Sequence, residues 1–199
     1  SDVEGIWGAL QAGSLQTTAT DNCTFCIEQK EMGKDDFSKI PNGVNGIEDR
    51  MTILYHTGVA SGKLSLTQYV AVTSTNSAKI FGLYPKKGVI AVGSDADITV
   101  IDPNVKRTIS AKTHYQACDR NIWEGWEVTG VNVYTLSRGD VVWKAHVENG
   151  VADWPKGELK AEPGRGKYMP RKPFGSAFDG IAIRDQQRAK AETPIVRPQ

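Results

Sequence analysis

Hydrophobic residues recur at helical spacing in the first part of the chain. Ile6 and Leu10 are four residues apart and predict a helix over residues 1–13. Residues 47–56 place hydrophobic side chains opposite charged ones, which predicts an amphipathic helix. Ser65 is a good N-terminal cap for a third helix, because its hydroxyl can accept from free N–H groups of the first turn. We therefore expect a helical region interrupted by loops.

The hydrophobic pattern changes after residue 87. A last short helix is predicted over residues 73–81, and from Gly88 onward hydrophobic residues alternate with polar ones, as in β-strands. Candidate strands cover residues 98–101, 105–109, 128–136 and 141–145. The last two strands are separated by Ser137-Arg138-Gly139-Asp140, a turn sequence that predicts a β-hairpin. These strands predict a small β-layer.

The composition changes again from Val151 to the end. Six of the nine prolines follow Trp154, and apolar periodicity is weak apart from a candidate short helix at residues 178–188. Such a segment cannot bury enough apolar surface to fold alone. We expect it to be disordered or to pack as an arm on another surface, such as a neighbouring subunit. The patterns divide the chain into residues 1–87, 88–150 and 151–199.

Composition and charge argue against several classes of partner. The chain has 199 residues and a formal net charge of +1, without a basic patch, so we expect no nucleic-acid partner. No apolar run approaches the roughly 20 residues that a membrane helix needs. Three cysteines, an odd number, favour a reducing compartment such as the cytoplasm. The first residues lack a signal peptide and an initiator Met and resemble a helix already under way, so we expect the polypeptide to begin further upstream.

Two short motifs resemble parts of metal, redox or catalytic sites, but neither is complete. Cys23 and Cys26 form a C-x-x-C, as in zinc sites and redox pairs, but Cys118 and three scattered histidines form no second ligand pair. Two neutral thiols are therefore the favoured interpretation. Asp95 and Asp97 lie in a Gly-Ser-Asp-Ala-Asp stretch, which is typical of a turn rather than of paired catalytic carboxylates.

One carboxylate, Asp21, follows a short β-rich run at residues 15–20. This run contains three threonines and predicts a strand that delivers Asp21 to its end. An Asp in this place is also a common turn former or helix N-cap. Within the long connection at residues 26–45, Lys39-Ile40-Pro41-Asn42-Gly43 predicts a tight turn whose backbone can face the same point as Asp21. These two segments are candidates for one active site.

Several motifs, in order along the chain, carry a resemblance to a known enzyme family. They include Thr20-Asp21-Asn22-Cys23-Thr24-Phe25, Gly33-Lys34-Asp35-Asp36-Phe37, Ile40-Pro41-Asn42-Gly43-Val44-Asn45-Gly46, Glu48-Asp49-Arg50-Met51 and Thr108-Ile109-Ser110-Ala111-Lys112-Thr113-His114. With these motifs the chain resembles the dihydropyrimidinase and hydantoinase family of amidohydrolases, nearly from end to end. It also resembles the collapsin-response-mediator proteins, the non-enzymatic relatives of these enzymes.

The resemblance implies an α/β fold that corresponds to the C-terminal part of the family's structure. In that family a metal-dependent (β/α)8 barrel, which alone takes about 250 residues, carries two metal ions, usually zinc. The chain would supply the last barrel strand and its helices in residues 1–87, part of a small β-sandwich in 88–150, and an extended C-terminal arm in 151–199. The family is usually tetrameric, which implies a homotetramer in which the arm reaches a neighbouring subunit.

The resemblance also assigns roles to two residues. Asp21 matches the family's metal-binding aspartate, which orients the attacking hydroxide, accepts its proton and returns that proton to the leaving nitrogen. Asn42 matches the residue whose backbone holds the ring amide of the substrate. The implied reaction is hydrolysis of the ring amide of 5,6-dihydropyrimidines, such as dihydrouracil and dihydrothymine, or of hydantoins.

The family's other metal ligands are missing from this chain. They are a His-x-His pair, a carboxylated lysine and two further histidines, and one aspartate cannot assemble a two-metal site. We therefore expect the 199-residue chain alone to be inactive. The alternative function is binding and oligomerisation of the collapsin-response-mediator type. The resemblance implies that those relatives lack the metal-site aspartate and the Pro-Asn-Gly turn, so Asp21 and Asn42 favour the enzyme.

Overall fold

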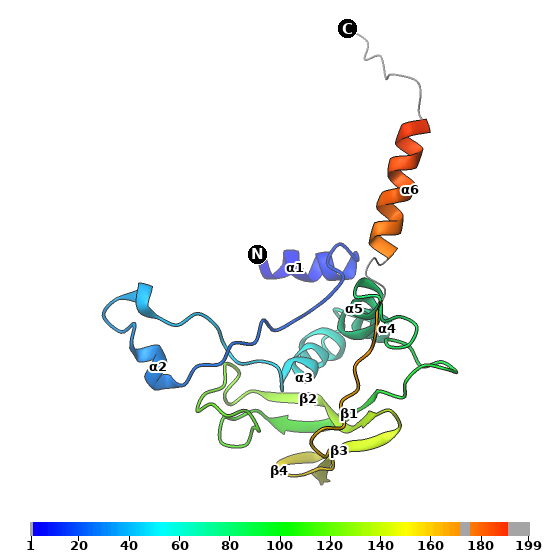
Figure 1. Cartoon of the computed structure of the whole chain (residues 1–199). Helices are drawn as coiled ribbons and strands as arrows, with labels where there is room; N and C mark the ends of the chain where they lie inside the picture. The colour runs from blue at the N-terminus through cyan, green and yellow to red at the C-terminus, as the bar shows by residue number, and fades with distance from the viewer. Residues whose placement is uncertain (1, 172–175, 191–199) are drawn as a thin grey trace.

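The computed structural model describes residues 2–171 and 176–190 (Figure 1). The helical elements are α1 (Asp2–Gln11), α2 (Ile27–Glu31), η1 (Phe37–Lys39), α3 (Arg50–Leu54), η2 (Tyr55–Ala60), α4 (Leu66–Val70), η3 (Ala71–Thr75), α5 (Asn76–Ile80) and α6 (Ser176–Lys190). The strands are β1 (Ile98–Thr108), β2 (Glu127–Ser137), β3 (Asp140–Glu148) and β4 (Val151–Leu159). In Figure 1, α3, α4 and α5 lie between α1 and the sheet.

The helix predicted at the start of the chain is present as α1. Leu10, near its end, is buried against Leu64 and Val72, and Trp7 packs against the same cluster. Near the start of α1, Ile6 is exposed. The helix therefore contacts the rest of the chain mainly through its second half.

Ser65 caps α4, as the sequence predicts. Its Oγ accepts from the backbone N–H of Gln68 at 3.2 Å, and Gln68 Oε1 accepts from the backbone N–H of Ser65 at 2.9 Å. The two residues thus form a capping box, which satisfies two N–H groups that the helix itself leaves free.

The two short helices predicted after Ser65 are one continuous helical run. α4, η3 and α5 follow one another without a break from Leu66 to Ile80, and η3 is a π-helical turn. Within it, the hydroxyl of Thr73 donates to the carbonyl of Tyr69 at 2.7 Å. The hydroxyl thus bonds within the helical run, whereas the sequence predicted a separate helix from Thr73.

The helix predicted over residues 47–56 is shifted along the chain. α3 begins only at Arg50, and a π-helical segment, η2, continues it to Ala60. Ile47, expected on its buried side, is 64% exposed and lies in a turn. Buried Tyr55, at the start of η2, packs against the sheet and extends the helix past its predicted end.

The strand predicted over residues 15–20 is absent from the described structure, where this segment is extended but unpaired. The segment pairs with no other strand in the described part of the chain, and a ladder needs a partner. Its backbone groups bond to helices instead. Thr18 donates its N–H to the carbonyl of Val72 at 2.9 Å, and Arg50 donates to the carbonyl of Thr18 at 2.7 Å.

The four strands form one sheet in which consecutive strands are antiparallel. The predicted hairpin is confirmed, with Ser137 pairing with Asp140 across the turn. A single parallel pair, Lys106 with Val151, brings β4 back to β1, so the sheet closes on itself. The sheet encloses a core of Val105, Val131, Ala145, Ala152 and Trp154.

Two predictions about the strands need correction. The candidate strands at 98–101 and 105–109 are one strand, β1, because Asp102-Pro103-Asn104 forms an irregularity in its pairing with β2 rather than a turn. β4 lies in the segment predicted to be an arm. Its Ala152 and Trp154 are buried, so the sheet extends to Leu159 instead of ending near residue 150.

A buried ion cluster fixes the helices to the sheet. Arg107 in β1, whose side chain is 1% exposed, pairs with Asp49 at 3.1 Å and with Glu48 at 3.4 Å. Asn121 donates to Asp49 at 2.7 Å, and Trp154 Nε1 donates to Glu48 at 2.6 Å. Burial lowers the pKa of Arg107, and the two carboxylates offset only part of this shift. Each carboxylate has a second donor, so the cluster is a specific link between the two regions.

A second link joins Tyr55 of η2 to Gly130 of β2. Gly130 has a φ of 81°, and a Cβ at this position would overlap the Tyr55 ring. The same ring meets Tyr69 edge to face, with centroids 5.7 Å apart. The glycine therefore makes room for an aromatic side chain on the surface of the sheet.

After β4 the chain returns beside the sheet to the end of α5 (Figure 1). Arg165 donates to the carbonyl of Ser137 at 3.1 Å and pairs with Asp140 at 2.9 Å, and Arg171 donates to the carbonyl of Phe81 at 3.0 Å. This part of the predicted arm packs on its own chain. The parts at 172–175 and 191–199 lie outside the described residues.

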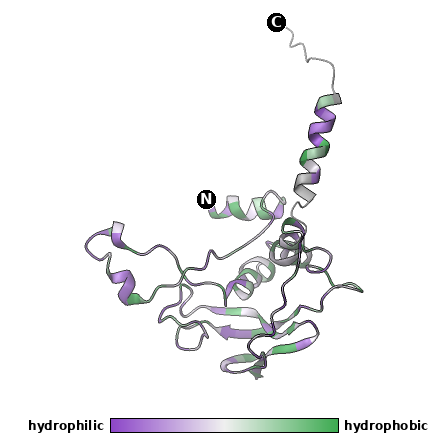
Figure 2. Cartoon of the chain, in the orientation of Figure 1, coloured by the Kyte–Doolittle hydropathy of each residue, from purple (hydrophilic) through white to green (hydrophobic). Residues whose placement is uncertain are grey.

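The helix predicted at residues 178–188 is present within α6, which points away from the rest of the chain (Figure 1). Figure 2 shows hydrophilic and hydrophobic residues mixed along this helix, as along the strands. None of the helices in residues 2–171 and 176–190 is both long and apolar enough to cross a lipid bilayer.

Candidate functional site

Asp21 sits in a turn at the end of the extended segment 15–20. Its φ is 45°, a left-handed backbone conformation that few residues other than glycine adopt and that Asp tolerates better than most. The residue is exposed, and its carboxylate has no hydrogen-bond partner in the described part of the chain. Strained backbone of this kind is often found at functional sites.

Asn22 fastens the Asp21 turn to the residues that lead into α3. Its Oδ1 accepts from the N–H of Gly46 at 2.9 Å and from the N–H of Ile47 at 3.2 Å. These two N–H groups precede the helix and have no other carbonyl partner within it. A side-chain amide therefore fixes the residue next to Asp21.

The turn that contains Asn42 lies directly against the Asp21 turn. The N–H of Cys23 donates to the carbonyl of Val44 at 3.1 Å. Gly43 has a φ of 119°, and a Cβ there would come within 2.6 Å of both the Cβ and the carbonyl oxygen of Cys23. Only glycine allows this approach, which explains the Asn-Gly sequence at this position.

The structure thus brings together the two loops that carry Asp21 and Asn42, while their side chains share no hydrogen bond. Asn42 is exposed, and its backbone N–H and C=O have no partner among residues 2–171 and 176–190. The loop therefore presents one free donor and one free acceptor beside a free carboxylate.

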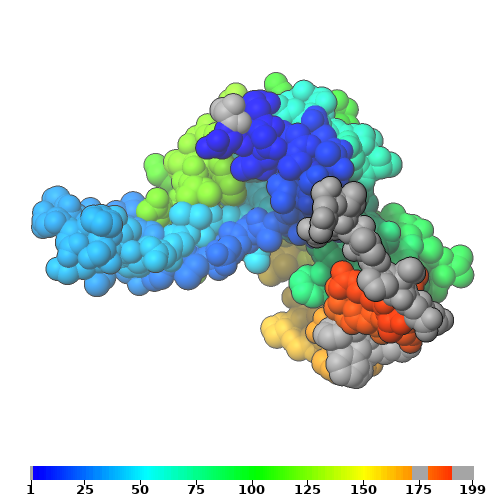
Figure 3. Space-filling view, turned by 90° about the horizontal axis from the view of Figure 1, so that it is seen from above, coloured from blue at the N-terminus to red at the C-terminus, as the bar shows by residue number. Residues whose placement is uncertain are grey.

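A residue that the sequence interpretation missed also contacts this loop. Lys30, in α2, donates from Nζ to the carbonyls of Pro41 and Gly43, the latter at 2.6 Å. Nothing in the sequence distinguishes Lys30 from the other lysines of the loop, because the contact depends on how residues 26–45 fold back. Figure 3 shows that this segment extends away from the rest of the chain.

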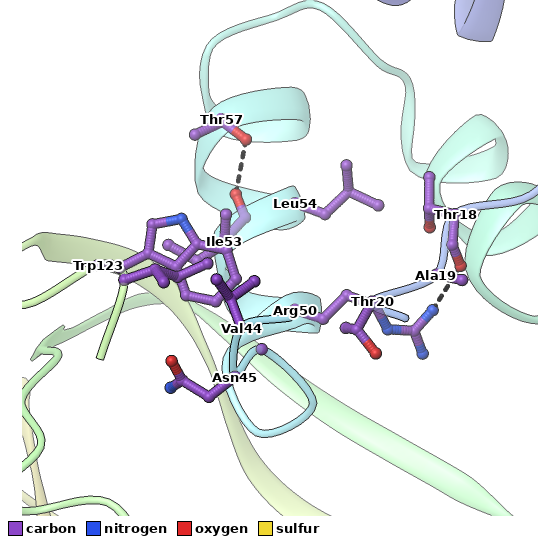
Figure 4. A pocket seen from close by; sticks show the side chains of 12 residues that line it. Thr18, Ala19, Thr20, Val44, Asn45, Arg50, Ile53, Leu54, Thr57 and Trp123 are labelled. Atoms are coloured by element: carbon purple, nitrogen blue, oxygen red, sulfur yellow. Dashed lines mark hydrogen bonds between the residues drawn. The ribbon is translucent and has the colours of Figure 1, made fainter. Parts of the chain in front are cut away.

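A cavity of about 230 Å³ is lined by residues just before Asp21 and just after the Asn42 turn (Figure 4). Its lining comes from the extended segment, the Asn42 loop, α3 and the loop before β2, and includes Thr18, Thr20, Val44, Asn45, Arg50 and Trp123. Asn45 is 3% exposed, and its amide has no partner in the described residues. Most of the lining is apolar, and neither Asp21 nor Asn42 contributes to it.

The described residues do not by themselves fit a metal site. Within them, no three His, Cys, Asp or Glu side chains come close enough to hold an ion. Asp21 is a single carboxylate, and the two cysteines of the C-x-x-C motif are free thiols, as is Cys118. Within the described residues, Asp21 is therefore an exposed carboxylate without neighbouring ligands.

Comparison with known proteins relates this geometry to a family. The model of the amidohydrolase family matches residues 1–142. The chain is 54% identical to a dihydropyrimidinase of Rattus norvegicus over 190 residues, which are 96% of this chain and 34% of that protein. It is 47% identical to a D-hydantoinase of Geobacillus stearothermophilus over 174 residues, which are 87% of this chain and 35% of that protein.

A solved structure gives the same result. The crystal structure of D-hydantoinase from Bacillus sp. AR9 superposes with a TM-score of 0.76 at 49% identity, over 86% of this chain and 35% of that one. The chain spans about a third of the length of the curated relatives that it matches. The similarity therefore covers most of this chain and a minor part of each relative.

Proposed function

The chain belongs to the amidohydrolase family, and we propose that it is the C-terminal part of a metal-dependent enzyme that hydrolyses the ring amide of small cyclic amides. The substrates that we propose are 5,6-dihydropyrimidines, such as dihydrouracil and dihydrothymine, or hydantoins. Relatives named dihydropyrimidinase and D-hydantoinase, which are 54% and 47% identical to the chain, support this class of substrate.

The observation that carries the proposal is the contact between the Asp21 and Asn42 loops. Hydrolysis of a ring amide needs a group that takes a proton from the attacking water and gives it to the leaving nitrogen. Asp21 suits this role, because its carboxylate is exposed and bonds to nothing else in the described residues. Fixed by Asn22 and Cys23, it would stay beside the bound ring.

Asn42 is the proposed substrate-binding residue. A cyclic imide or ureide presents N–H donors and carbonyl acceptors along the edge of its ring. The free backbone N–H and C=O of Asn42 complement such an edge. A site that forms hydrogen bonds with both kinds of group disfavours molecules that lack one of them.

Amidohydrolases are generally metal-dependent, and we propose two zinc ions in the complete enzyme, with Asp21 as one ligand. Bound zinc polarises carbonyl groups and lowers the pKa of water. The other ligands would come from residues outside these 199.

The same proposal extends to the fold and the assembly. Residues 15–20 would form the last strand of a (β/α)8 barrel, whose neighbouring strands would satisfy the backbone of this extended segment. The sheet from β1 to β4 would be part of a small β-sandwich. We also propose a homotetramer in the cytoplasm, for which the three free thiols support the reducing compartment.

The test is the Asp21→Asn variant of the full-length enzyme, assayed for ring opening of dihydrouracil and of hydantoin. Loss of a proton-transfer group should lower kcat by about 10³-fold or more. The matched control is Asp35→Asn, since Asp35 is exposed on the same loop and forms no ion pair in the described residues. Its kcat should stay within about twofold of the wild-type value.

Normal turnover by Asp21→Asn would contradict the role of Asp21. A wild-type enzyme that neither binds zinc nor opens either ring would contradict the whole proposal. That result would favour the alternative, a binding protein of the collapsin-response-mediator type.

A further inference from the structure

Lys30 holds the carbonyl groups of the two residues that flank Asn42. Its ammonium group donates to the carbonyls of Pro41 and Gly43, the residues that flank Asn42, the latter at 2.6 Å. The side chain comes from α2 and is partly buried between this helix and the turn. One charged group thus fixes two carbonyls of a three-residue turn.

The same ammonium group also contacts the Asp21 side of the site. Nζ lies 5.1 Å from the centre of the Phe25 ring, a distance at which a cation is attracted to an aromatic face. Phe25 follows Asp21 by four residues. Lys30 therefore touches both loops that the proposed site brings together.

This arrangement affects what Asn42 can bind. A lysine has three donors and no acceptor, so the carbonyls of Pro41 and Gly43 are occupied as acceptors and held to one side. Asn42, between them, keeps its own N–H and C=O without a partner in the described residues. Without the ammonium group, the flanking carbonyls would be free to rotate and to compete for the N–H groups of a ligand.

We propose that Lys30 is a positioning residue, which fixes the Pro41–Gly43 turn so that the backbone of Asn42 meets the ring amide of the substrate. The inference rests on the proposed function, because it assumes that Asn42 binds the ring. Lys30 touches neither the substrate nor the reacting atoms. Its effect should therefore fall on binding more than on the chemical step.

The test compares Lys30→Met with Lys34→Met in the full-length enzyme. Both substitutions remove an ammonium group from the same loop, but Lys34 is exposed and its side chain has no hydrogen bond or ion pair in the described part of the chain. For Lys30→Met we expect the KM for dihydrouracil to rise about tenfold, with kcat changed less than about threefold. Lys34→Met should leave both values unchanged. Lys30→Arg, which keeps the charge and the donors, should recover part of the loss.

Hydrogen exchange gives a second readout that does not depend on activity. Peptides covering residues 40–46 should exchange about tenfold faster in Lys30→Met than in Lys34→Met, because charge-assisted hydrogen bonds hold this turn. This measurement separates the two proposals. Faster exchange in an enzyme that does not open the ring would support the role of Lys30 in holding the turn, and it would contradict the proposed function.

Two results would overturn the inference itself. Equal exchange of residues 40–46 in the two variants would mean that Lys30 does not hold the turn. Faster exchange with an unchanged KM would mean that Lys30 holds the turn but does not position Asn42 for a substrate.

Discussion

The closed sheet and the segment that leads to Asp21 use extended backbone in opposite ways. β1 to β4 pair with one another along their length, and β4 returns to β1. Residues 15–20 are also extended, yet their backbone bonds go to side chains and carbonyls of helices, such as Arg50 and Val72. In a β-ladder, regular hydrogen bonds to the neighbouring strand fix the backbone along its whole length, whereas residues 15–20 depend on a few separate contacts. The candidate site therefore relies on how firmly the helices are held.

The helices are held, in turn, by the sheet. Glu48 and Asp49 lie just before α3, and both pair with Arg107 of β1. Tyr55, six residues after Asp49, packs on Gly130 of β2. The sheet thus supports the helices, and through them the segment that leads to Asp21, by contacts at Arg107 and Gly130. Changes at these two residues should affect both the sheet and the helices.

The largest effect should come from removing Arg107. In Arg107→Met, the buried carboxylates of Asp49 and Glu48 lose their cation, and breaking one side of a buried ion pair costs about 3–5 kcal/mol of the free energy of unfolding. Denaturant unfolding of the full-length protein measures this change. The control is Lys106→Met in the same strand, because Lys106 is exposed. If both variants lost the same amount, the cluster would not be a link between the regions.

A smaller effect should come from Gly130→Ala. The added methyl group would overlap the Tyr55 ring, and overpacking of this kind together with the left-handed backbone should cost about 2–3 kcal/mol. Gly139→Ala separates the two causes, because Gly139 has a φ of 90° but no atom within 4 Å of the added carbon. Gly139→Ala should show the backbone cost of about 1 kcal/mol alone. Equal losses in the two variants would show that Tyr55 does not press on the sheet.

The smallest effect concerns pH and the connection between the two regions. Lys86 and Lys87 pair with Asp95 at 2.6 and 2.9 Å, and their hydrogen bonds lower the pKa of Asp95. A lowered folded pKa stabilises the protein above the ordinary Asp value of about 4, and this contribution is lost as the pH falls through the lowered value. The Tm difference between wild type and Asp95→Asn should therefore shrink between pH 6 and pH 2. A difference independent of pH would contradict the ion pair.

Local signals in the sequence predicted much of the regular structure. The helix at Leu10, the Ser65 cap and the hairpin between Ser137 and Asp140 are all present, because each depends on residues close together in the chain. The strand at 15–20 was predicted from its threonines, but a strand also needs a partner, which composition does not report. β1 was divided in two because Asp102-Pro103-Asn104 usually marks a turn, whereas pairing with β2 carries the strand past it.

The candidate site was predictable only in part. Asp21 and the turn that contains Asn42 were selected from strand-end and turn chemistry, and the resemblance to a family then assigned a role to each residue. The charged residues that hold the site in place gave no local signal. Arg107 lies 58 residues beyond Asp49, and Lys30 reaches its two carbonyls only after the loop folds back. Contacts of this kind depend on the complete fold, so single-sequence patterns do not contain them.

The loop between Asp21 and α3 is closed at its base. Cys23 bonds to Val44, and Asn22 bonds to Gly46, while Phe37 at the start of η1 is 85% exposed. In Figure 1 the part of this loop around α2 extends away from α3, α4 and α5. Loop-closure entropy changes only slowly with length, so residues added at the tip should cost little stability. Residues 34–38 are therefore a place where insertions, labels or attachment points can be added while Asp21 and Asn42 keep their spacing, whereas Gly33 packs too closely on Ile40 to be changed.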